Sequence, residues 1–263
     1  MKNIRDFARA HREAQPIVMV TAYDAAMARI VAASEADAIL VGDSAAMVVH
    51  GFPSTIHATI EMMVLHTAAV RRGAPDSIVI SDLPFLTFRQ GIATASRAAG
   101  ALMQAGATAV KLEGVTGHED VVAHLVESGI PVMGHLGLTP QSVNQLGGYR
   151  VQGRSDAEAT RLRAEAKRLQ ELGAFALVLE CVPGALAAEI TQSLDIPVIG
   201  IGAGAGTSGQ VLVLNDLLGF DAGFRPRFAR RYLNLHDEAL AALNEFARDV
   251  RAARFPAREE VLA

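Results

Sequence analysis

The chain has one cysteine, no tryptophan and few aromatic residues, and it lacks any long apolar run. A single thiol, Cys181, excludes an internal disulfide and fits a reducing compartment. No uninterrupted apolar stretch approaches the ~20 residues that span a membrane. The N-terminal residues Lys2, Arg5 and Asp6 bring charge to the place where a signal peptide needs an apolar segment. We therefore expect a cytoplasmic protein with no membrane partner.

An excess of charge is also missing. The formal net charge is -4 over 263 residues, which gives no reason to expect a nucleic acid or an anionic membrane as partner. Hydrophobic residues make up 51% of the chain, enough for a large core. We predict one domain over residues 1–263, with a helix in residues 1–15 and a flexible tail in residues 251–263.

Short apolar runs recur along the chain between stretches with helical spacing. The predicted strands cover residues 17–22, 38–41, 78–80, 109–112, 131–133, 176–179 and 197–201, with an eighth candidate at 210–214 that could equally begin a helix. The clearest helical stretches are residues 95–105, 156–172 and 184–194. Strands that alternate with helices indicate a parallel sheet, whose buried strands are almost continuously apolar.

Eight such units fill the length of a (β/α)8 barrel, which is about 250 residues. An open doubly wound sheet is the main alternative, but no glycine-rich phosphate turn follows the first strand, where that fold usually carries one. The sequence therefore favours the α/β barrel.

Four carboxylates close the apolar runs: Asp43, Asp82, Glu113 and Glu180. An unpaired buried carboxylate costs several kcal/mol or shifts its pKa, so four of them suggest a shared cation or a base. In a barrel the carboxyl ends of all strands open on one face, where active sites form. For each acid alone, a helix cap or a buried salt bridge is the simpler explanation; their convergence favours a site.

The motifs around these acids resemble the ketopantoate hydroxymethyltransferase family. The matching strings, in order, are Val41-Gly42-Asp43-Ser44, Ser81-Asp82-Leu83-Pro84-Phe85, Val110-Lys111-Leu112-Glu113-Gly114, residues 134–142, Val178-Leu179-Glu180-Cys181-Val182-Pro183 and residues 200–204. Ala45 and Ala46 replace the Leu-Gly pair usual in that family, and the lost glycine would alter the next loop if it needed a positive φ.

The resemblance implies a barrel of the phosphoenolpyruvate/pyruvate type with one Mg²⁺ per subunit. It implies transfer of a hydroxymethyl group from 5,10-methylenetetrahydrofolate to 3-methyl-2-oxobutanoate, giving 2-dehydropantoate in the first step of pantothenate and coenzyme A synthesis. It also implies large homo-oligomers, typically decamers. The implied roles are metal binding by Asp43, Asp82 and Glu113, substrate binding by Asp43, Ser44, Asp82 and Lys111, and proton acceptance by Glu180.

The chemistry agrees with these roles. Mg²⁺ prefers oxygen ligands, so two or three carboxylates plus the adjacent carboxylate and keto oxygens of a 2-oxo acid suit it. A chelated keto group makes the neighbouring C3 proton acidic, because its loss gives a metal-stabilised enolate. Glu180, two strands beyond Glu113, is expected to remove that proton.

Other residues keep two interpretations. Lys111 projects to the same side of its strand as Glu113 and either holds substrate or forms a structural ion pair. His135, at the predicted end of the fifth strand, either contacts substrate or hydrogen-bonds in the barrel mouth. Ser44 either binds the substrate carboxylate or caps the next helix. Cys181 has no His partner by sequence and is expected to be inert.

Two loops and two rival functions stay open. Residues 141–154 are either a lid that excludes water or an ordered loop. The glycine-rich residues 200–206 either cradle phosphate or let backbones pack closely. The alternative activity is a Mg²⁺-dependent lyase or mutase of the same superfamily that acts on a 2-oxo acid without folate. A non-catalytic binding barrel is the other alternative.

Overall fold

The computed structural model describes residues 3–223 and 226–261, which belong to two compact units, Met1–Val213 and Leu214–Ala263. All eight strands identified in this part of the chain lie in the first unit. The single domain expected over residues 1–263 stays a prediction.

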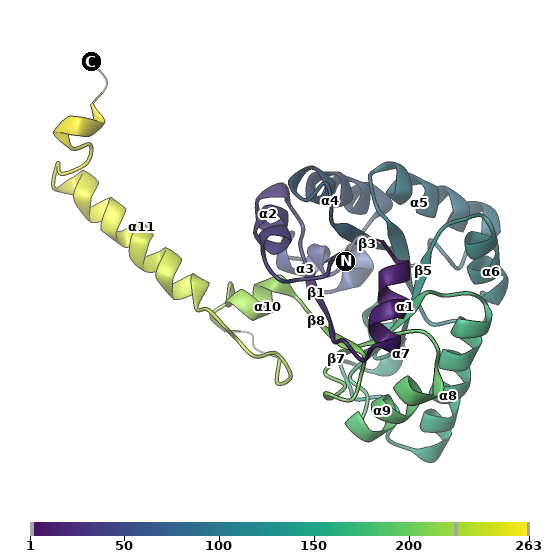
Figure 1. Ribbon diagram of the computed structural model, residues 1–263. Coiled ribbons are helices and arrows are strands. Elements are labelled where there is room, and N and C mark those ends of the chain that lie inside the picture. Colours follow the sequence, from purple (N-terminus) through teal and green to yellow (C-terminus); the bar gives the residue numbers. More distant parts are fainter. Residues whose placement is uncertain (1–2, 224–225, 262–263) are drawn as a thin grey trace. The chain divides into compact units, whose positions relative to one another are not determined.

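The first unit is a closed barrel of parallel strands in the order of the sequence (Figure 1). The strands are β1 (Ile17–Thr21), β2 (Ala38–Val41), β3 (Ile78–Asp82), β4 (Ala109–Glu113), β5 (Val132–Gly137), β6 (Ala176–Glu180), β7 (Val198–Ile201) and β8 (Gly209–Leu212). β1 pairs with both β2 and β8, with Ile17 opposite Gly209, and this pairing closes the barrel. The predicted (β/α)8 fold is confirmed.

Most strand bounds lie within one or two residues of their predicted ranges, and two strands call for a correction. The eighth candidate is a strand rather than the start of a helix, and it begins at Gly209. The sequence predicted that His135 ends the fifth strand. β5 continues to Gly137, so His135 lies inside this strand. Gly134 and Gly137 are poor strand formers by themselves, but pairing with β4 and β6 holds this part of the strand extended.

Alternate strand residues point inward and form the barrel core. The core includes Ile17, Met19, Ala38, Leu40, Ile78, Ile80, Ala109, Met133, Ala176, Val178, Ile199, Ile201 and Val211. Helix α1 (Arg5–Arg12) adds Phe7 and Ala10 to this cluster, and the Phe7 ring packs edge-on against Phe175, with centroids 5.6 Å apart. Because Phe175 directly precedes β6, α1 covers the amino ends of the strands and leaves the carboxyl ends for a site. The helix expected in residues 1–15 is therefore present.

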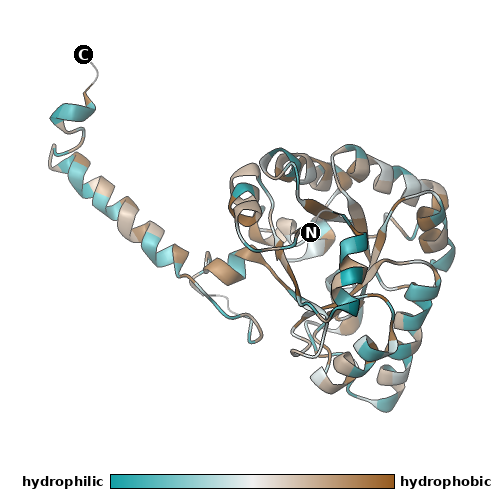
Figure 2. Ribbon diagram, in the orientation of Figure 1, coloured by the Kyte–Doolittle hydropathy of each residue, from teal (hydrophilic) through white to brown (hydrophobic). Residues whose placement is uncertain are grey.

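Helices surround the barrel, and their outer faces are more hydrophilic than the strands inside (Figure 2). They are α2 (Ala25–Ala33), α3 (Ala45–Val48), α4 (Ile60–Gly73), α5 (Ile92–Gln104), α6 (Glu119–Glu127), α7 (Val143–Leu146), α8 (Asp156–Glu171) and α9 (Gly184–Ser193), with short 3-10 turns at Thr55–His57 and Pro140–Ser142. α8 begins with a capping box: the Ser155 hydroxyl accepts from the Glu158 N–H, and the Glu158 carboxylate accepts from the Ser155 N–H.

The second unit contains α10 (Leu214–Leu218), α11 (Leu235–Arg251) and a 3-10 turn at Arg258–Glu260. α11 has an exposed apolar row formed by Leu240, Leu243, Phe246 and Val250. Among the residues the structure describes, no helix combines the length and the apolar character that a membrane crossing needs.

Candidate active site

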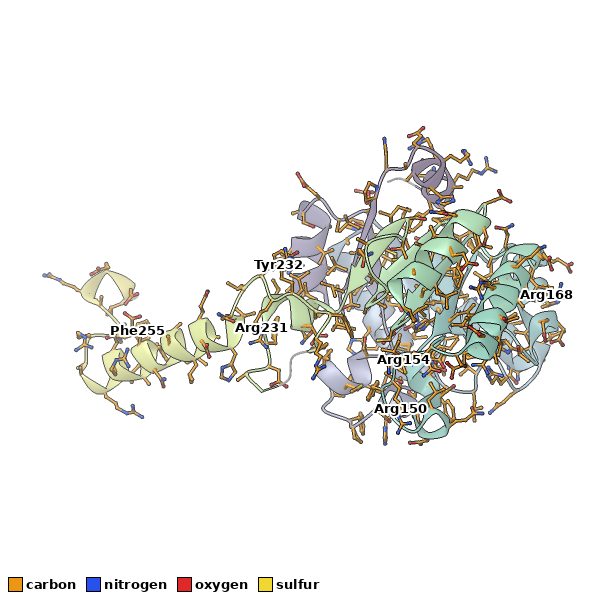
Figure 3. The ribbon with its side chains drawn as sticks, turned by 90° about the horizontal axis from the view of Figure 1, so that it is seen from below. Arg150, Arg154, Arg168, Arg231, Tyr232 and Phe255 are labelled. Carbon is orange, nitrogen blue, oxygen red and sulfur yellow. The ribbon has the colours of Figure 1, made fainter. Side chains whose placement is uncertain are left out.

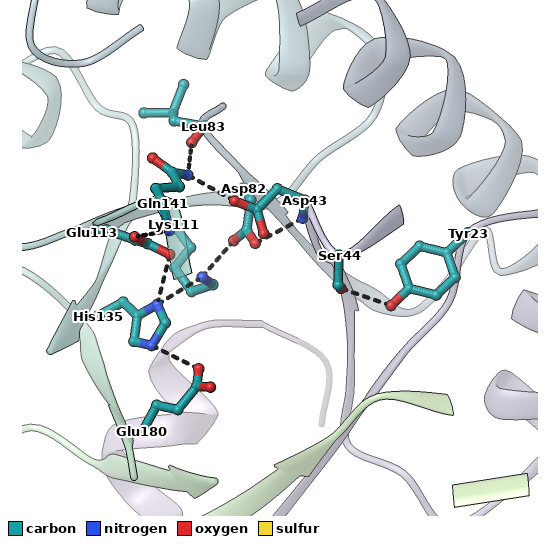
Figure 4. A network of polar contacts seen from close by, with 10 residues as sticks. All are labelled: Tyr23, Asp43, Ser44, Asp82, Leu83, Lys111, Glu113, His135, Gln141 and Glu180. Carbon is teal, nitrogen blue, oxygen red and sulfur yellow. Dashed lines mark hydrogen bonds and ion pairs between the residues drawn. The ribbon is translucent and has the colours of Figure 1, made fainter. Parts of the chain in front are cut away.

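The barrel core ends in charged side chains at the carboxyl ends of the strands. Inward-facing positions alternate along each strand, so Asp82 follows Ile78 and Ile80, and Glu180 follows Ala176 and Val178. Lys111 and Glu113 follow Ala109 in the same way, and His135 follows Met133. The fold therefore brings together at one end of the barrel residues that are far apart in the sequence (Figure 4).

Asp43 lies just beyond β2 and joins the same network. Its N–H donates to Asp82 Oδ2 at 3.0 Å, and its own Oδ2 accepts from Gln141 Nε2 at 2.8 Å. The Gln141 N–H donates to Glu113 Oε2 at 3.0 Å, and its amide also donates to the Leu83 carbonyl. Gln141 is buried and therefore holds two of the acids in fixed positions.

Lys111 and His135 bring positive charge among the acids. Lys111 Nζ lies 2.8 Å from Asp82 Oδ1 and 3.3 Å from His135 Nδ1. His135 Nδ1 is 3.5 Å from Glu113 Oε1, and its Nε2 is 3.2 Å from Glu180 Oε2. His135 thus lies between Glu113 and Glu180, and Glu180 is separated from Asp43 and Asp82 (Figure 4).

Burial and mutual charge shift the pKa values in this network. Burial, and then the charges of Asp82 and Glu113, raise the pKa of Asp43 well above its ordinary value. Burial opposes the charged form of Lys111, but the surrounding acids raise its pKa above the usual range. Burial and Lys111 also oppose the imidazolium of His135, yet contacts with Glu113 and Glu180 outweigh them and raise the pKa to about 9. At neutral pH, His135 is therefore a cation that faces Glu180.

The donor set suits a hard divalent cation. The four carboxylates outnumber the two cations, Lys111 and His135, and repulsion among the acids adds to burial in raising the pKa of Asp43. No three His, Cys, Asp or Glu side chains within residues 3–223 and 226–261 are already arranged to hold a metal ion. Mg²⁺, however, usually binds through one or two carboxylates and completes its shell with water and substrate. Asp43, Asp82 and Glu113 therefore fit this ion.

Ser44 is held toward the site by a residue that the sequence did not reveal. It precedes α3, but its hydroxyl makes no capping hydrogen bond to that helix and lies 2.8 Å from the Tyr23 hydroxyl. Ala45 and Ala46 begin α3 and have ordinary negative φ angles, so the lost glycine causes no strain there. Tyr23 and Gln141 each follow a strand end, which is the one local signal that could have identified them.

Residues 141–154 carry Tyr149 to the edge of the site. The Tyr149 hydroxyl contacts Met47 Sδ of α3 at 3.7 Å. Partial burial, and then the charges of Glu180, Asp43 and Glu113, raise its pKa. The ring is 55% exposed, so it borders the mouth rather than filling it. A lid function for this loop stays a prediction.

Cys181 and the glycine-rich loop have structural explanations. Burial, and then the charge of Glu180, raise the pKa of the Cys181 thiol to about 11, which keeps the thiol protonated and unreactive at neutral pH. In residues 200–206, a Cβ added at Gly206 would lie 2.6 Å from the Cβ of Ala188 in α9. This observation favours close packing as the role of that glycine.

Comparisons with known protein sequences identify one family. The family model described as ketopantoate hydroxymethyltransferase matches residues 1–258. A 3-methyl-2-oxobutanoate hydroxymethyltransferase of Bdellovibrio bacteriovorus is 52% identical over 260 residues, which cover 99% of each chain. A protein of the same name from Coxiella burnetii is 50% identical, covering 97% of this chain and 96% of its own. The family model therefore also covers most of the second unit.

Solved structures with the same fold are more distant in sequence. A 2,3-dimethylmalate lyase of the PEP mutase/isocitrate lyase superfamily has a TM-score of 0.60 and 17% identity, covering 100% of this chain and 92% of its own. A phosphonopyruvate hydrolase has a TM-score of 0.65 and 11% identity, covering 100% of this chain and 92% of its own. At these identities the likeness shows the fold alone, a (β/α)8 barrel.

Proposed function

The chain belongs to the ketopantoate hydroxymethyltransferase family, and from this membership we propose that it transfers the hydroxymethyl group of 5,10-methylenetetrahydrofolate to 3-methyl-2-oxobutanoate. The product would be 2-dehydropantoate, in the first step of pantothenate synthesis. The observation that carries the proposal is the separation within the acid network (Figure 4): Asp43, Asp82 and Glu113 lie together, and Glu180 stands beyond His135.

We assign the cation site to Asp43, Asp82 and Glu113, whose oxygen donors suit Mg²⁺. When bound, the ion would polarise the keto oxygen of the substrate and make the C3 proton more acidic. Lys111 would place its ammonium near the substrate oxygens, and Ser44, held by Tyr23, would donate to the substrate carboxylate.

Glu180 would act as the base. Its carboxylate would take the proton from C3, and the electron pair left behind would form a new bond to the methylene carbon of the folate. One of the two carbon–nitrogen bonds of this methylene group breaks as the carbon–carbon bond forms. The second breaks when water supplies the hydroxyl oxygen, and the two folate nitrogens take up the proton from C3 and the remaining proton of the water. His135, positively charged at neutral pH, would keep Glu180 ionised and oriented.

Deuterium exchange at C3 of 3-methyl-2-oxobutanoate tests this assignment. The wild type should exchange the proton only with a divalent metal present, and Glu180→Gln should lose the exchange while still binding substrate. Glu189→Gln is the matched control, because Glu189 is on α9 and pairs with Arg163 at the surface. Persistent exchange in Glu180→Gln would remove Glu180 as the base.

Dependence on folate separates this function from the alternative. A lyase or mutase of the same superfamily would convert a 2-oxo acid without a one-carbon donor. Product formation from 3-methyl-2-oxobutanoate should therefore be measured with and without methylenetetrahydrofolate. Turnover that needs no folate would favour the lyase or mutase.

We also propose that the protein acts in the cytoplasm as a homo-oligomer, a decamer in line with the family resemblance. The exposed apolar row on α11 supports self-association, because monomeric proteins rarely leave such continuous apolar surface uncovered.

A further inference from the structure

A cavity of about 500 Å³ lies beside the barrel mouth, outside the acid network. It runs between the segment after β5 and the first half of α8, and its lining includes Gly114, Leu136 and Gly137. Gly114 directly follows Glu113, and Gly137 pairs with Glu180 in the sheet. The cavity therefore borders backbone next to Glu113 and Glu180, yet none of the four acids lines it. Its size is typical of a small-molecule site.

The cavity lining includes two arginines, Arg150 and Arg161, that form no ion pair with the acids of residues 3–223 and 226–261. Other arginines, such as Arg163 and Arg168 on α8, form ion pairs with glutamates. Arg150 comes from the segment after β5, where its carbonyl accepts from Gln152 Nε2 at 3.1 Å. Arg161 lies on α8. The two arginines therefore line the cavity from two different elements, and we infer that their charges are available to a ligand.

The acids of the lining are already hydrogen-bonded to their own surroundings. Glu158 Oε2 accepts from the backbone N–H groups of Arg154 and Ser155, and these bonds lower its pKa. Glu165 Oε1 accepts from the Thr116 hydroxyl at 3.0 Å. The free hydrogen-bonding capacity of the cavity is thus mainly that of donors, which suits an anion and in particular a carboxylate.

The cavity also has an apolar wall. Leu136 and Leu162 are buried at its base, and Leu146 and Val151 line it from the segment after β5. Apolar side chains beside two arginines fit a ligand that joins an aromatic ring to carboxylates.

We propose that this cavity binds the p-aminobenzoyl-glutamate tail of the folate donor, with the glutamate carboxylates on Arg150 and Arg161. The inference rests on the proposed function, which requires the one-carbon end of the folate near Glu180. The four acids of the mouth repel the anionic tail, and Lys111 is already paired with Asp82. Arg150 and Arg161 supply the positive charge at a short distance from the mouth, and the leucines accommodate the benzoyl ring.

Steady-state kinetics of Arg150→Gln, Arg161→Gln and the double variant test the inference. Each single variant should raise the KM for methylenetetrahydrofolate roughly three- to tenfold, since the lost ion pairs are charge-assisted but exposed to solvent. The KM for 3-methyl-2-oxobutanoate and kcat should stay unchanged. Arg168→Gln is the matched control: Arg168 is on the same helix but does not line the cavity, and it lies well apart from Arg150 in Figure 3.

A truncated donor links the effect to the tail. With a methylenetetrahydropterin that lacks the benzoyl-glutamate, the variants and the wild type should share the same KM. A rise in KM that persists with this donor would contradict tail binding. If the wild type turns over normally and the double variant has the same KM for the complete folate, that result would also contradict tail binding.

Direct binding distinguishes failure of this inference from failure of the proposed function. p-Aminobenzoyl-glutamate should bind the wild type, as followed by ligand-observed NMR, and lose binding in the double variant. A wild type without folate-dependent turnover would overturn the proposed function. A wild type that turns over but binds the fragment no better than the double variant would overturn the inference alone.

Discussion

At the scale of single residues, Gln141 contacts two of the candidate metal ligands, although its position in the sequence gives little sign of this role. Its side chain donates to Asp43, and its backbone donates to Glu113, so one residue restrains two acids that come from different strands. Partners that orient metal ligands commonly change metal affinity 10- to 100-fold when they are lost. Gln141 is therefore a positioning residue for the acid network.

Gln141→Leu should weaken Mg²⁺ binding about tenfold and destabilise the fold by about 1–3 kcal/mol, because the leucine leaves buried Asp43 without this donor. Isothermal titration with Mg²⁺ and chemical denaturation measure the two effects. Gln170→Leu is a suitable control, since the Gln170 amide also donates to an aspartate, Asp195, away from the site. Equal Mg²⁺ affinity in both variants would contradict the positioning role.

His118 makes stability depend on pH. Burial, and then the charge of Arg89, lower its pKa to about 4, whereas the ordinary value in an unfolded chain is about 6.5. Above pH 6.5 both states are neutral at this ring. As the pH falls from 6.5 toward 4, the unfolded chain gains a proton that the folded chain resists, so stability is lost in that window.

His118→Asn should therefore lose less stability than the wild type between pH 7 and pH 5, by on the order of 1 kcal/mol. Denaturant unfolding at both pH values measures the difference. His236→Asn, which removes an exposed ring of the second unit, should follow the wild-type slope. If the free energy of unfolding falls equally with pH in the wild type and in His118→Asn, the His118 ring does not contribute to the pH dependence of stability.

At the scale of elements, the contact between β1 and β8 depends on a glycine. A Cβ at Gly209 would lie 2.2 Å from the Ile17 carbonyl oxygen, which belongs to the neighbouring strand backbone and has little room to move. Gly209→Ala should destabilise the barrel by about 1–3 kcal/mol or more, because overpacking forces the two strands apart. Gly100→Ala in α5 is the control, since nothing lies within 4 Å of its added Cβ and alanine favours a helix. Thermal unfolding measurements should show a lower Tm than the wild type for Gly209→Ala only.

Sequence patterns predicted the elements whose apolar residues are continuous and missed details that depend on pairing. β2 matches its predicted range, 38–41, because all four of its residues are apolar and buried. β8 was ambiguous because Gly209 and the exposed Gln210 do not read as a buried strand, and only β1 and β7 define its register. The same reasoning explains β5, whose second half is held by its neighbours.

The candidate site divides in the same way. Asp43, Asp82, Glu113 and Glu180 could be predicted because each closes an apolar run. Gln141 could not, because it lies 98 residues from Asp43 in the chain and only the folded barrel brings the two together. Its place after a strand end is the one local signal, and many polar residues that belong to no site share that place.

At the scale of the whole molecule, the exposed face of α11 bears on assembly. Leu240, Leu243, Phe246 and Val250 recur at spacings of three and four residues, so they share one side of the helix. The four residues are between 47% and 66% exposed, and within the described residues of the second unit only the Phe246 ring among them has a ring contact, edge-on against Phe255 with centroids 5.2 Å apart. A second copy of the chain is the partner that the proposed homo-oligomer would supply.

Leu243→Glu combined with Phe246→Glu should break up the homo-oligomer and so lower the molar mass of the protein in solution. The reason is that burying two new carboxylates in an apolar interface costs several kcal/mol. Light scattering after size exclusion measures the mass over a range of protein concentrations. Ala241→Glu adds a charge on the opposite side of α11, at an exposed position, and should leave the mass unchanged. A wild type that runs as a monomer would contradict the proposed homo-oligomer, and an unchanged large assembly in the double variant would show that α11 is not its interface.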